Sequence, residues 1–288
     1  MRALSHAPED PDPTHGRTMT PRDPMRLRLT FDAIAERYDR ARPGYPHRIF
    51  EDLAALGELE SGSRILEIGC GTGLATVPLA ERGYRVLAVE LGGDLAAIAR
   101  RRLATHPNVE VIVASFEDWP LPKEPFDAVV SATAFHWIDP EIRVTKTAQA
   151  LRPGGSLAII ETRRVPLWDA QLLAKLWRCH ERWDPTAHPA RRPLPDEPPE
   201  STAEVDRSGR FDRIASRRYE WVQEYSTAEY IDLLMTFSNV LALEPTQQSG
   251  LLWCIGDLID GELDGRVREV NVNQLLVART SDQPASRR

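Results

Sequence analysis

Short apolar runs alternate with stretches of helical periodicity between residues 64 and 161. The apolar runs, each with the length and composition of a buried strand, are 64–68, 85–89, 109–113, 126–131 and 156–161. Apolar residues recur at three- and four-residue spacing in the stretches 74–82, 94–105 and 141–151, which indicates amphipathic helices. Because parallel strands need crossover connections, this alternation predicts an α/β fold with a mostly parallel sheet flanked by helices.

The pattern changes on both sides of this region. Phe31, Ile34, Ala35 and Tyr38 form an apolar stripe at helical spacing, and Pro46 can open a second helix that ends near residue 57. After Thr162 the expected elements are a helix at 167–183, a strand at 217–222, helices at 226–240 and 245–259, and a strand at 269–278. Prolines crowd 185–199, which excludes regular structure there and predicts a loop.

A glycine-rich turn follows the first predicted strand directly. Residues 67–73 read Glu-Ile-Gly-Cys-Gly-Thr-Gly, and glycine lets the chain turn tightly and lets a ligand touch the backbone. The turn lies at the carboxyl end of a strand, where α/β sheets bind ligands. Glu90 ends the second strand 19 residues after Gly71, and a carboxylate there can accept hydrogen bonds from ribose hydroxyls. The two features together indicate a nucleoside site.

The spacing of the glycines distinguishes between nucleoside cofactors. A pyrophosphate cofactor prefers G-x-G-x-x-G, whereas Gly69, Gly71 and Gly73 form G-x-G-x-G. This stretch resembles the E-x-G-x-G-x-G signature of class I S-adenosylmethionine-dependent methyltransferases, whose loop wraps a methionine tail. Later segments also resemble that family, in order: an adenine-contacting turn, a fourth strand and a turn before the fifth strand, at 114–118, 126–130 and 151–155. The stretch 38–46 resembles the N-terminus of small-molecule methyltransferases of the trans-aconitate and ubiquinone/menaquinone type.

The resemblance implies a Rossmann-like sheet of seven strands with the last strand antiparallel, and a helical cap or insertion. It also implies S-adenosyl-L-methionine as cofactor. The expected cofactor-binding residues are Glu67, Gly69, Cys70, Gly71, Gly73, Glu90, Leu91, Ser115, Phe116, Glu117 and Arg42. Ser115 stands where the family often has an aspartate that meets the adenine amino group, which leaves this contact to Ser115, to the Phe116 backbone or to Glu117.

Two of these residues have alternative interpretations. Glu67 could fix the ammonium group of the cofactor, or it could brace the loop. Arg42 could bind the carboxylate of the cofactor or an anionic substrate through two hydrogen bonds, or it could be a surface charge before Pro43.

The segment after the fourth strand is the expected acceptor side of the site. His136 could act as a general base on an acceptor hydroxyl or amine, and Phe135 and Trp137 could form the wall of the acceptor site. The alternatives are a hydrogen-bonded loop histidine and packed aromatic side chains. No metal site is predicted, because His180 and His188 lack partners at ligand spacing.

These expectations divide the chain into four parts. Residues 1–25 form a disordered tail, 26–161 the S-adenosylmethionine-binding core with its N-terminal helices, 162–240 a cap on the substrate side with a proline-rich loop at 184–200, and 241–280 a return to the core sheet.

Bulk properties narrow the location and the partners. The 288 residues carry a net charge of -7, which disfavours a nucleic-acid substrate. No apolar run is long enough for a membrane span. The three cysteines, few and odd in number, fit a reducing cytoplasm better than a disulfide scaffold.

The sequence thus predicts a cytoplasmic S-adenosylmethionine-dependent methyltransferase that transfers a methyl group by in-line displacement to an acceptor that is a small molecule. Two alternatives stay open: a non-catalytic protein that binds S-adenosylmethionine, and an NAD-dependent dehydrogenase. The glycine spacing opposes the dehydrogenase, and no partnered His/Asp or Tyr/Lys set for hydride transfer is visible.

Overall fold

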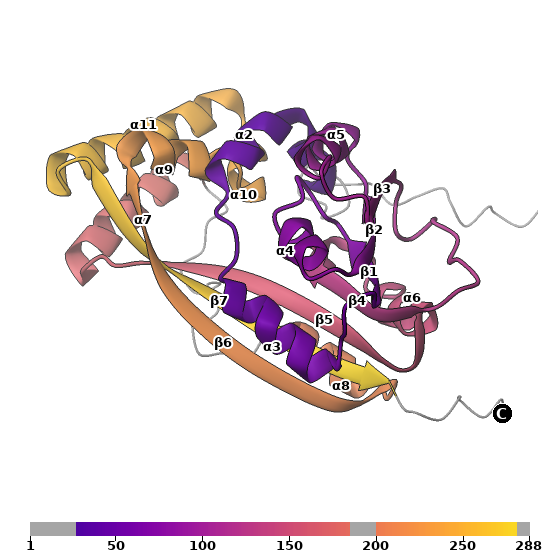
Figure 1. Ribbon diagram of the computed structural model, residues 1–288. Coiled ribbons are helices and arrows are strands. Elements are labelled where there is room, and N and C mark those ends of the chain that lie inside the picture. The colour runs from indigo at the N-terminus through magenta and orange to yellow at the C-terminus, as the bar shows by residue number, and fades with distance from the viewer. Residues whose placement is uncertain (1–26, 185–199, 281–288) are drawn as a thin grey trace, which may run out of the picture.

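A computed structural model describes residues 27–184 and 200–280, and in this part of the chain seven strands form one sheet in the order β3-β2-β1-β4-β5-β7-β6 (Figure 1). The strands are β1 (Arg64–Ile68), β2 (Arg85–Glu90), β3 (Val109–Val113), β4 (Phe126–Ala132), β5 (Leu151–Pro166), β6 (Phe211–Ser226) and β7 (Arg266–Thr280). β1 to β5 pair in parallel, and β7 lies antiparallel between β5 and β6. The predicted Rossmann-like sheet, mostly parallel with an antiparallel last strand, is therefore confirmed.

The helices of the described residues flank this sheet. Those before β5 are the 3-10 helix η1 (Arg28–Ile34), α2 (Ala35–Ala41), α3 (His47–Gly57), α4 (Thr76–Glu81), α5 (Gly93–Arg102), the 3-10 turn η2 (Phe135–Trp137) and α6 (Arg143–Ala150). Those after β5 are α7 (Ala170–Trp183), α8 (Glu200–Arg207), α9 (Thr227–Leu234), α10 (Ser238–Leu241) and α11 (Pro245–Glu262). None of them is long and apolar enough to cross a membrane.

The inner parallel strands β1, β2, β4 and β5 are largely buried on both faces, as their apolar runs predict, whereas β3 at the edge of the sheet has no fully buried residue. Ile65 and Leu66 are neighbours in β1, both fully buried, and they belong to two different hydrophobic clusters. One cluster includes Phe50 of α3 and Leu79 of α4, and the other includes Val144 of α6. The alternation of side chains along a strand thus supplies both faces of the core.

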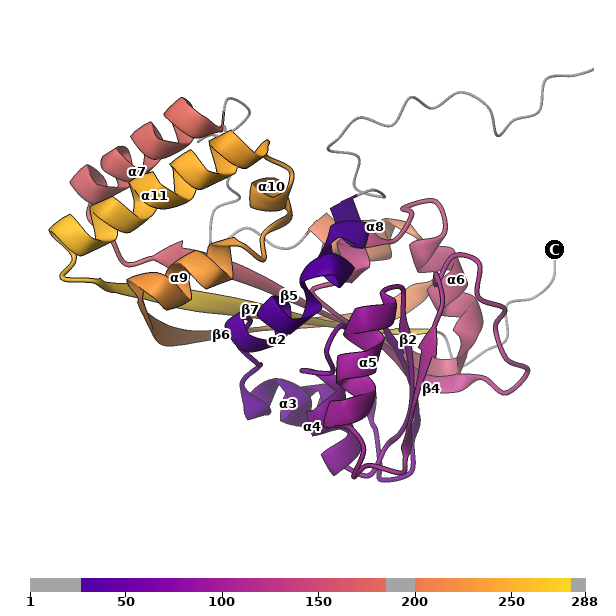
Figure 2. The same cartoon turned by 90° about the horizontal axis from the view of Figure 1, so that it is seen from above.

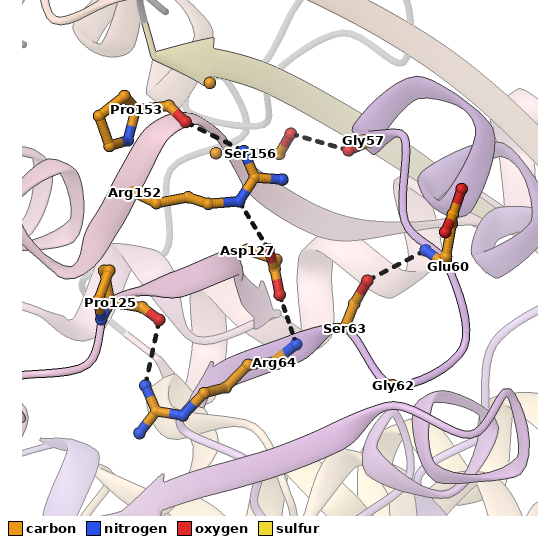
Figure 3. Close-up of polar contacts among 12 residues, drawn as sticks. Gly57, Glu60, Gly62, Ser63, Arg64, Pro125, Asp127, Arg152, Pro153 and Ser156 are labelled. Atoms are coloured by element: carbon orange, nitrogen blue, oxygen red, sulfur yellow. Dashed lines mark hydrogen bonds and ion pairs between the residues drawn. The ribbon is translucent and has the colours of Figure 1, made fainter.

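A carboxylate braces the amino ends of the central strands, on the edge opposite the glycine turn (Figure 3). Asp127, at the start of β4, accepts hydrogen bonds from the backbone amide of Arg64 at 2.7 Å and from Nε of Arg152 at 2.6 Å. These contacts tie β1, β4 and the start of β5 together, and they leave the carboxyl edge of the sheet for ligands.

Several predicted boundaries were wrong. The helix predicted from Leu74 begins at Thr76, so Pro78 lies in the first turn, where a missing amide costs no helical hydrogen bond and no kink is needed. β5 already begins at Leu151 and passes through the predicted turn at 152–155, with a shift of register between Phe126 and Ala128 of its partner β4. The single helix predicted at 226–240 is two helices, α9 and α10, and a capping box of Ser226 and Glu229 begins the first of them.

The largest difference lies in the length of the last three strands. β5, β6 and β7 have 16, 16 and 15 residues, and they run past the short parallel strands toward a separate group of helices (Figure 2). We call α7, α9, α10 and α11 the cap; together they form a third hydrophobic cluster around residues such as Tyr230, Leu251 and Ile255. The predicted cap at 162–240 thus contains β6, a strand of the main sheet, while α11 of the cap comes after it.

The cysteine interpretation was wrong in one respect. Cys179 of α7 and Cys254 of α11 form a disulfide across 75 residues, and only Cys70 is a free thiol among the described residues. Sequence spacing cannot show this pair, because it depends on two cap helices packing side by side. The predicted tail at 1–25 and residues 185–199 of the proline-rich loop lie outside the described residues.

Candidate functional site

A cavity of about 570 Å³ opens at the carboxyl edge of the sheet, between the strand ends and the cap. We divide its wall into two halves. The cofactor half consists of Ile68, Gly69, Gly71 and residues 89–91 and 114–117, together with Arg28, Phe31 and Tyr38. The acceptor half consists of Arg42, residues 163–166, and cap residues that include His180, Tyr230 and Phe237, together with Glu269 of β7. Residues 132–134 and 136–138 lie between the two halves.

The three glycines of the turn after β1 serve different purposes. Gly71 lines the cavity with φ +56°, and the nearest atom to an added Cβ is Cε1 of Tyr38 at 3.9 Å, so a side chain there would enter open cavity space. Gly69, at φ +70°, leaves no room for a side chain, because a Cβ would lie 2.6 Å from Cβ of Ala134. The turn is thus a backbone cradle that suits a ligand approaching Gly71.

Glu90 connects this cradle to β2. Its Oε2 accepts a hydrogen bond from the amide of Gly71 at 2.8 Å, and its Oε1 accepts one from the amide of Gly92 at 2.9 Å. Each carboxylate oxygen has capacity for a further hydrogen bond, and Glu90 lines the cavity, so a ribose diol can still be bound. Burial raises the pKa of Glu90, while the backbone amides of Gly92 and Gly71 act in the opposite direction.

Glu67 lies below the cradle and away from the cavity wall. It is 1% exposed, and its carboxylate makes no close hydrogen bond within the described residues, although the Thr76 hydroxyl lies near it. Burial raises its pKa to about 7 against the opposing effect of Thr76, and the negative charge of Glu90 adds to the rise. A buried carboxylate with so little compensation fits a cationic group brought to the loop, as the ammonium of S-adenosylmethionine would be. This observation is compatible with both interpretations of Glu67.

The acidic residue of the adenine turn is already engaged within the protein. Oε1 of Glu117 forms an ion pair with Nη1 of Arg28 at 2.6 Å, and Oε2 accepts the hydroxyl hydrogen bond of Ser115 at 2.7 Å. Glu117, Ser115 and Phe116 all line the cofactor half. The expected adenine turn is thus in place, and Arg28 of η1, which the sequence did not single out, covers it.

His136 and Trp137 lie on the wall between the halves. The rings of His136 and Trp137 are 4.8 Å apart, and Phe31 of η1 packs edge-on against Trp137 at 5.5 Å. His136 is exposed toward the cavity but enclosed by protein on its other sides, and this desolvation, with the charges of Arg143 and Arg42, lowers its pKa to about 4. It is therefore a neutral imidazole at physiological pH.

Besides Glu67, three further predicted site residues do not line the cavity. Phe135 is 2% exposed and packs in the core, with the guanidinium of Arg143 over its ring. Cys70 is buried in the cluster below the loop, which explains a small apolar residue at this place. Gly73 faces Leu103 and Ala99 of the neighbouring α5 region, so it permits close packing and not ligand approach.

Arg42 connects the N-terminal helices to the cap. Its Nε donates to Oγ1 of Thr236 at 2.8 Å and its Nη2 donates to the carbonyl of Thr236 at 2.6 Å. Its guanidinium also stands over the rings of Tyr38 and Phe237. Arg42 lines the cavity with these two donors already used, so the interpretation as an isolated surface charge was wrong.

A chain of polar contacts that was not predicted leads from β4 to the long strands β5 and β7. Thr133 has φ +55°, which is unusual for a branched residue, and its hydroxyl lies 3.0 Å from Tyr45 Oη and 3.3 Å from Thr162 Oγ1. Asn273 donates to the same Thr162 hydroxyl at 2.8 Å. Backbone strain of this kind collects at functional sites, and Thr133 lines the cavity beside His136.

Comparison with known proteins agrees with this geometry. Residues 65–155 match the family model described as a methyltransferase domain. An uncharacterized methyltransferase of Mycobacterium tuberculosis is 33% identical over 138 residues, which cover 48% of this chain and 54% of the relative. An uncharacterized methyltransferase of Schizosaccharomyces pombe is 26% identical over 267 residues, which cover 88% of this chain and 97% of the relative. This chain spans about half the length of the Mycobacterium proteins that it matches.

A solved structure extends the similarity to the cap side. A protein of Anaeromyxobacter dehalogenans that is proposed to be a type II methyltransferase superposes with a TM-score of 0.56 at 25% identity, covering 84% of this chain and 99% of its own. The strand order, the glycine turn and the matched domain at residues 65–155 make this chain similar to class I S-adenosylmethionine-dependent methyltransferases. Proteins of that class use S-adenosylmethionine as methyl donor.

Proposed function

We propose that the protein transfers a methyl group from S-adenosylmethionine to a small acidic or neutral organic molecule. The observation that carries the proposal is that one cavity joins the cradle at Gly71 and Glu90 to the acceptor half under the cap. When bound, S-adenosylmethionine supplies an electrophilic methyl group on a sulfonium. The protein must then hold an acceptor atom in line behind this methyl, and both halves of the cavity are needed for that.

Each part of the cavity wall has a proposed role. Gly69, Gly71 and Leu91 form the surface against the cofactor, and Glu90 accepts hydrogen bonds from the ribose. Ser115, Phe116 and Glu117 surround the adenine, with Arg28 holding Glu117 in place. Glu67 faces the ammonium group from below. Residues 64–118 thus hold the cofactor, whereas 134–139 and the cap select the acceptor.

The acceptor is proposed to be a small molecule because the cavity volume is that of a small-ligand site and the cap covers it. The net charge of -7 disfavours the phosphate backbone of a nucleic acid. An acceptor that carries a proton at working pH needs a base, and the neutral His136 ring is the candidate beside the strand end. A carboxylate acceptor needs no base, so the proposal does not depend on His136.

Calorimetry tests the cofactor and excludes the dehydrogenase. We expect the purified protein to bind S-adenosylmethionine and S-adenosylhomocysteine and not NAD; binding of NAD alone would falsify the proposal. Incubation with methyl-labelled S-adenosylmethionine and a metabolite extract then separates an enzyme from a non-catalytic binding protein. Label that never leaves the cofactor, with binding intact, would favour the latter.

A further inference from the structure

The acceptor half of the cavity is strongly cationic. Three arginines line it, Arg42, Arg163 and Arg164, and the carboxylate on the same wall is Glu269. Oε1 of Glu269 already accepts the hydrogen bond of Tyr230 Oη at 2.9 Å. The lining of this half thus holds more arginines than carboxylates, in a space large enough for a ligand.

Two of these guanidinium groups share one aromatic ring. The Cζ atom of Arg164 lies 5.4 Å from the centre of the Phe237 ring, and that of Arg42 lies 4.9 Å from the same centre. The groups are close enough for the charge of Arg164 to act with burial in lowering the pKa of Arg42. Among the salt bridges of the described residues, none involves Arg42 or Arg164. Two like charges that lie close together and form no ion pair favour the binding of an anion between them.

Within the described residues, the guanidinium of Arg164 has an N–H donor that is not used in a hydrogen bond, at the position where Arg42 uses its own. Its Nε is buried and has no hydrogen-bond partner in the part of the chain that the structure describes, whereas Nε and Nη2 of Arg42 both donate to Thr236. Asn271 stands directly opposite Arg164 on β7 and is 0% exposed, and hydrogen bonding from both side chains lowers the pKa of the nearby Tyr225 hydroxyl against the stronger effect of burial. Polar side chains of β6 and β7 thus lie beside Arg164, which itself lines the cavity.

We propose that the methyl acceptor carries an acidic group, a carboxylate or a phosphate, that Arg164 binds beside the Phe237 ring. This inference rests on the proposed function, because it names the class of molecule for the acceptor half. A guanidinium binds either anion through parallel hydrogen bonds, and the ring of Phe237 offers a flat apolar surface to the body of the molecule. The acidic group anchors the acceptor, whether or not it also receives the methyl.

Binding of three isosteric probes tests the proposal. The protein saturated with S-adenosylhomocysteine is titrated with benzoate, phenyl phosphate and benzamide, in the wild type and in Arg164→Gln, Arg164→Lys and Arg217→Gln. Arg217 is an exposed arginine of β6 outside the cavity wall, and it serves as the matched control. The preference between benzoate and phenyl phosphate identifies the anion.

We expect at least one anion to bind tenfold or more tightly than benzamide. Arg164→Gln should weaken that anion about 10- to 100-fold, the worth of a charge-assisted hydrogen bond, and Arg164→Lys should weaken it less. Arg217→Gln should change nothing, and S-adenosylhomocysteine affinity should stay within twofold in all variants, which shows that they fold. Equal binding of benzamide, no binding of either anion, or an unchanged preference in Arg164→Gln overturns the inference. If S-adenosylhomocysteine itself does not bind, the proposed function fails separately, and the anion preference is measured on the free protein.

Discussion

Asp32 caps a helix that begins 61 residues later: its Oδ1 accepts hydrogen bonds from the amides of Asp94 at 2.7 Å and Leu95 at 3.0 Å, in the first turn of α5. The same contact fixes η1, whose Arg28 and Phe31 cover the cofactor half. A lost cap of this kind costs about 1 kcal/mol. We therefore expect Asp32→Ala to lower the free energy of unfolding by about 1 kcal/mol, and to weaken S-adenosylhomocysteine several-fold. Asp32→Asn keeps an acceptor oxygen, so it should retain most of the stability and most of the affinity for S-adenosylhomocysteine. Equal losses in the two variants would contradict this.

Gly71 and Glu90 should be needed for the cofactor and not for the fold. Gly71→Val places a side chain in the cavity at a positive φ, so we expect undetectable binding of S-adenosylhomocysteine with an unchanged circular dichroism spectrum. Gly44→Val is the control, because a Cβ at Gly44 would meet nothing within 4 Å. Glu90→Ala should weaken the cofactor by about 1.5–3 kcal/mol. Wild-type affinity in Glu90→Ala would place the ribose contact elsewhere.

The buried Glu67 makes cofactor affinity depend on pH. Its pKa of about 7 means that the carboxyl is largely protonated at pH 6, and an ammonium group prefers the ionised form. Affinity for S-adenosylmethionine should therefore rise from pH 5.5 through pH 7 and level off above about pH 8, where the carboxyl is almost fully ionised. Calorimetry across this range checks it, with Glu67→Gln as the variant expected to lose the dependence. A wild-type profile that is as flat as that of the variant would leave Glu67 as a brace of the loop.

The depressed pKa of His136 sets an unusual acid limit for turnover. With a pKa of about 4, the ring stays neutral down to about pH 5, so a rate that needs neutral His136 should fall only below that pH. An ordinary histidine would already give a decline near pH 6.5. His136→Ala should reduce kcat about 100-fold or more if the acceptor carries a proton, with cofactor affinity unchanged. Trp137→Ala should likewise affect turnover and not cofactor binding; full rates in both variants would remove this segment from acceptor selection.

Reduction of the Cys179–Cys254 disulfide should loosen the cap. The disulfide closes a long loop, and such crosslinks typically stabilise by about 2–4 kcal/mol. We expect dithiothreitol to lower the melting temperature by several degrees, and Cys179→Ser to lower it equally, with no further effect of the reductant. Cys70→Ser is the control without a crosslink. Three reactive thiols in the denatured, unreduced protein would show instead that the cysteines are free, as the predicted cytoplasmic location would favour.

The cofactor half could be predicted from the sequence because its signals are local. The strand, the glycines and Glu90 lie within one β-α-β unit, and the strands 64–68 and 109–113 have the predicted boundaries. The acceptor half could not be predicted in this way. Arg164, Phe237 and Glu269 come from distant segments, and only the register of β5 with β7 brings the first and the last of them to one wall. Periodicity also does not show how far β6 extends, because polar residues interrupt the apolar ones along this edge strand.

The unequal strand lengths have a consequence for the evolution of the enzyme. The cofactor half lies at the ends of β1 to β4, strands of five to seven residues. The acceptor half lies beside β5, β6 and β7, which have 15 or 16 residues and extend past the shorter strands. We expect mutations on the extended part of these strands to alter acceptor specificity without disturbing the packing around the cradle. Acceptor specificity can then change at one end of the molecule while the binding of S-adenosylmethionine is retained.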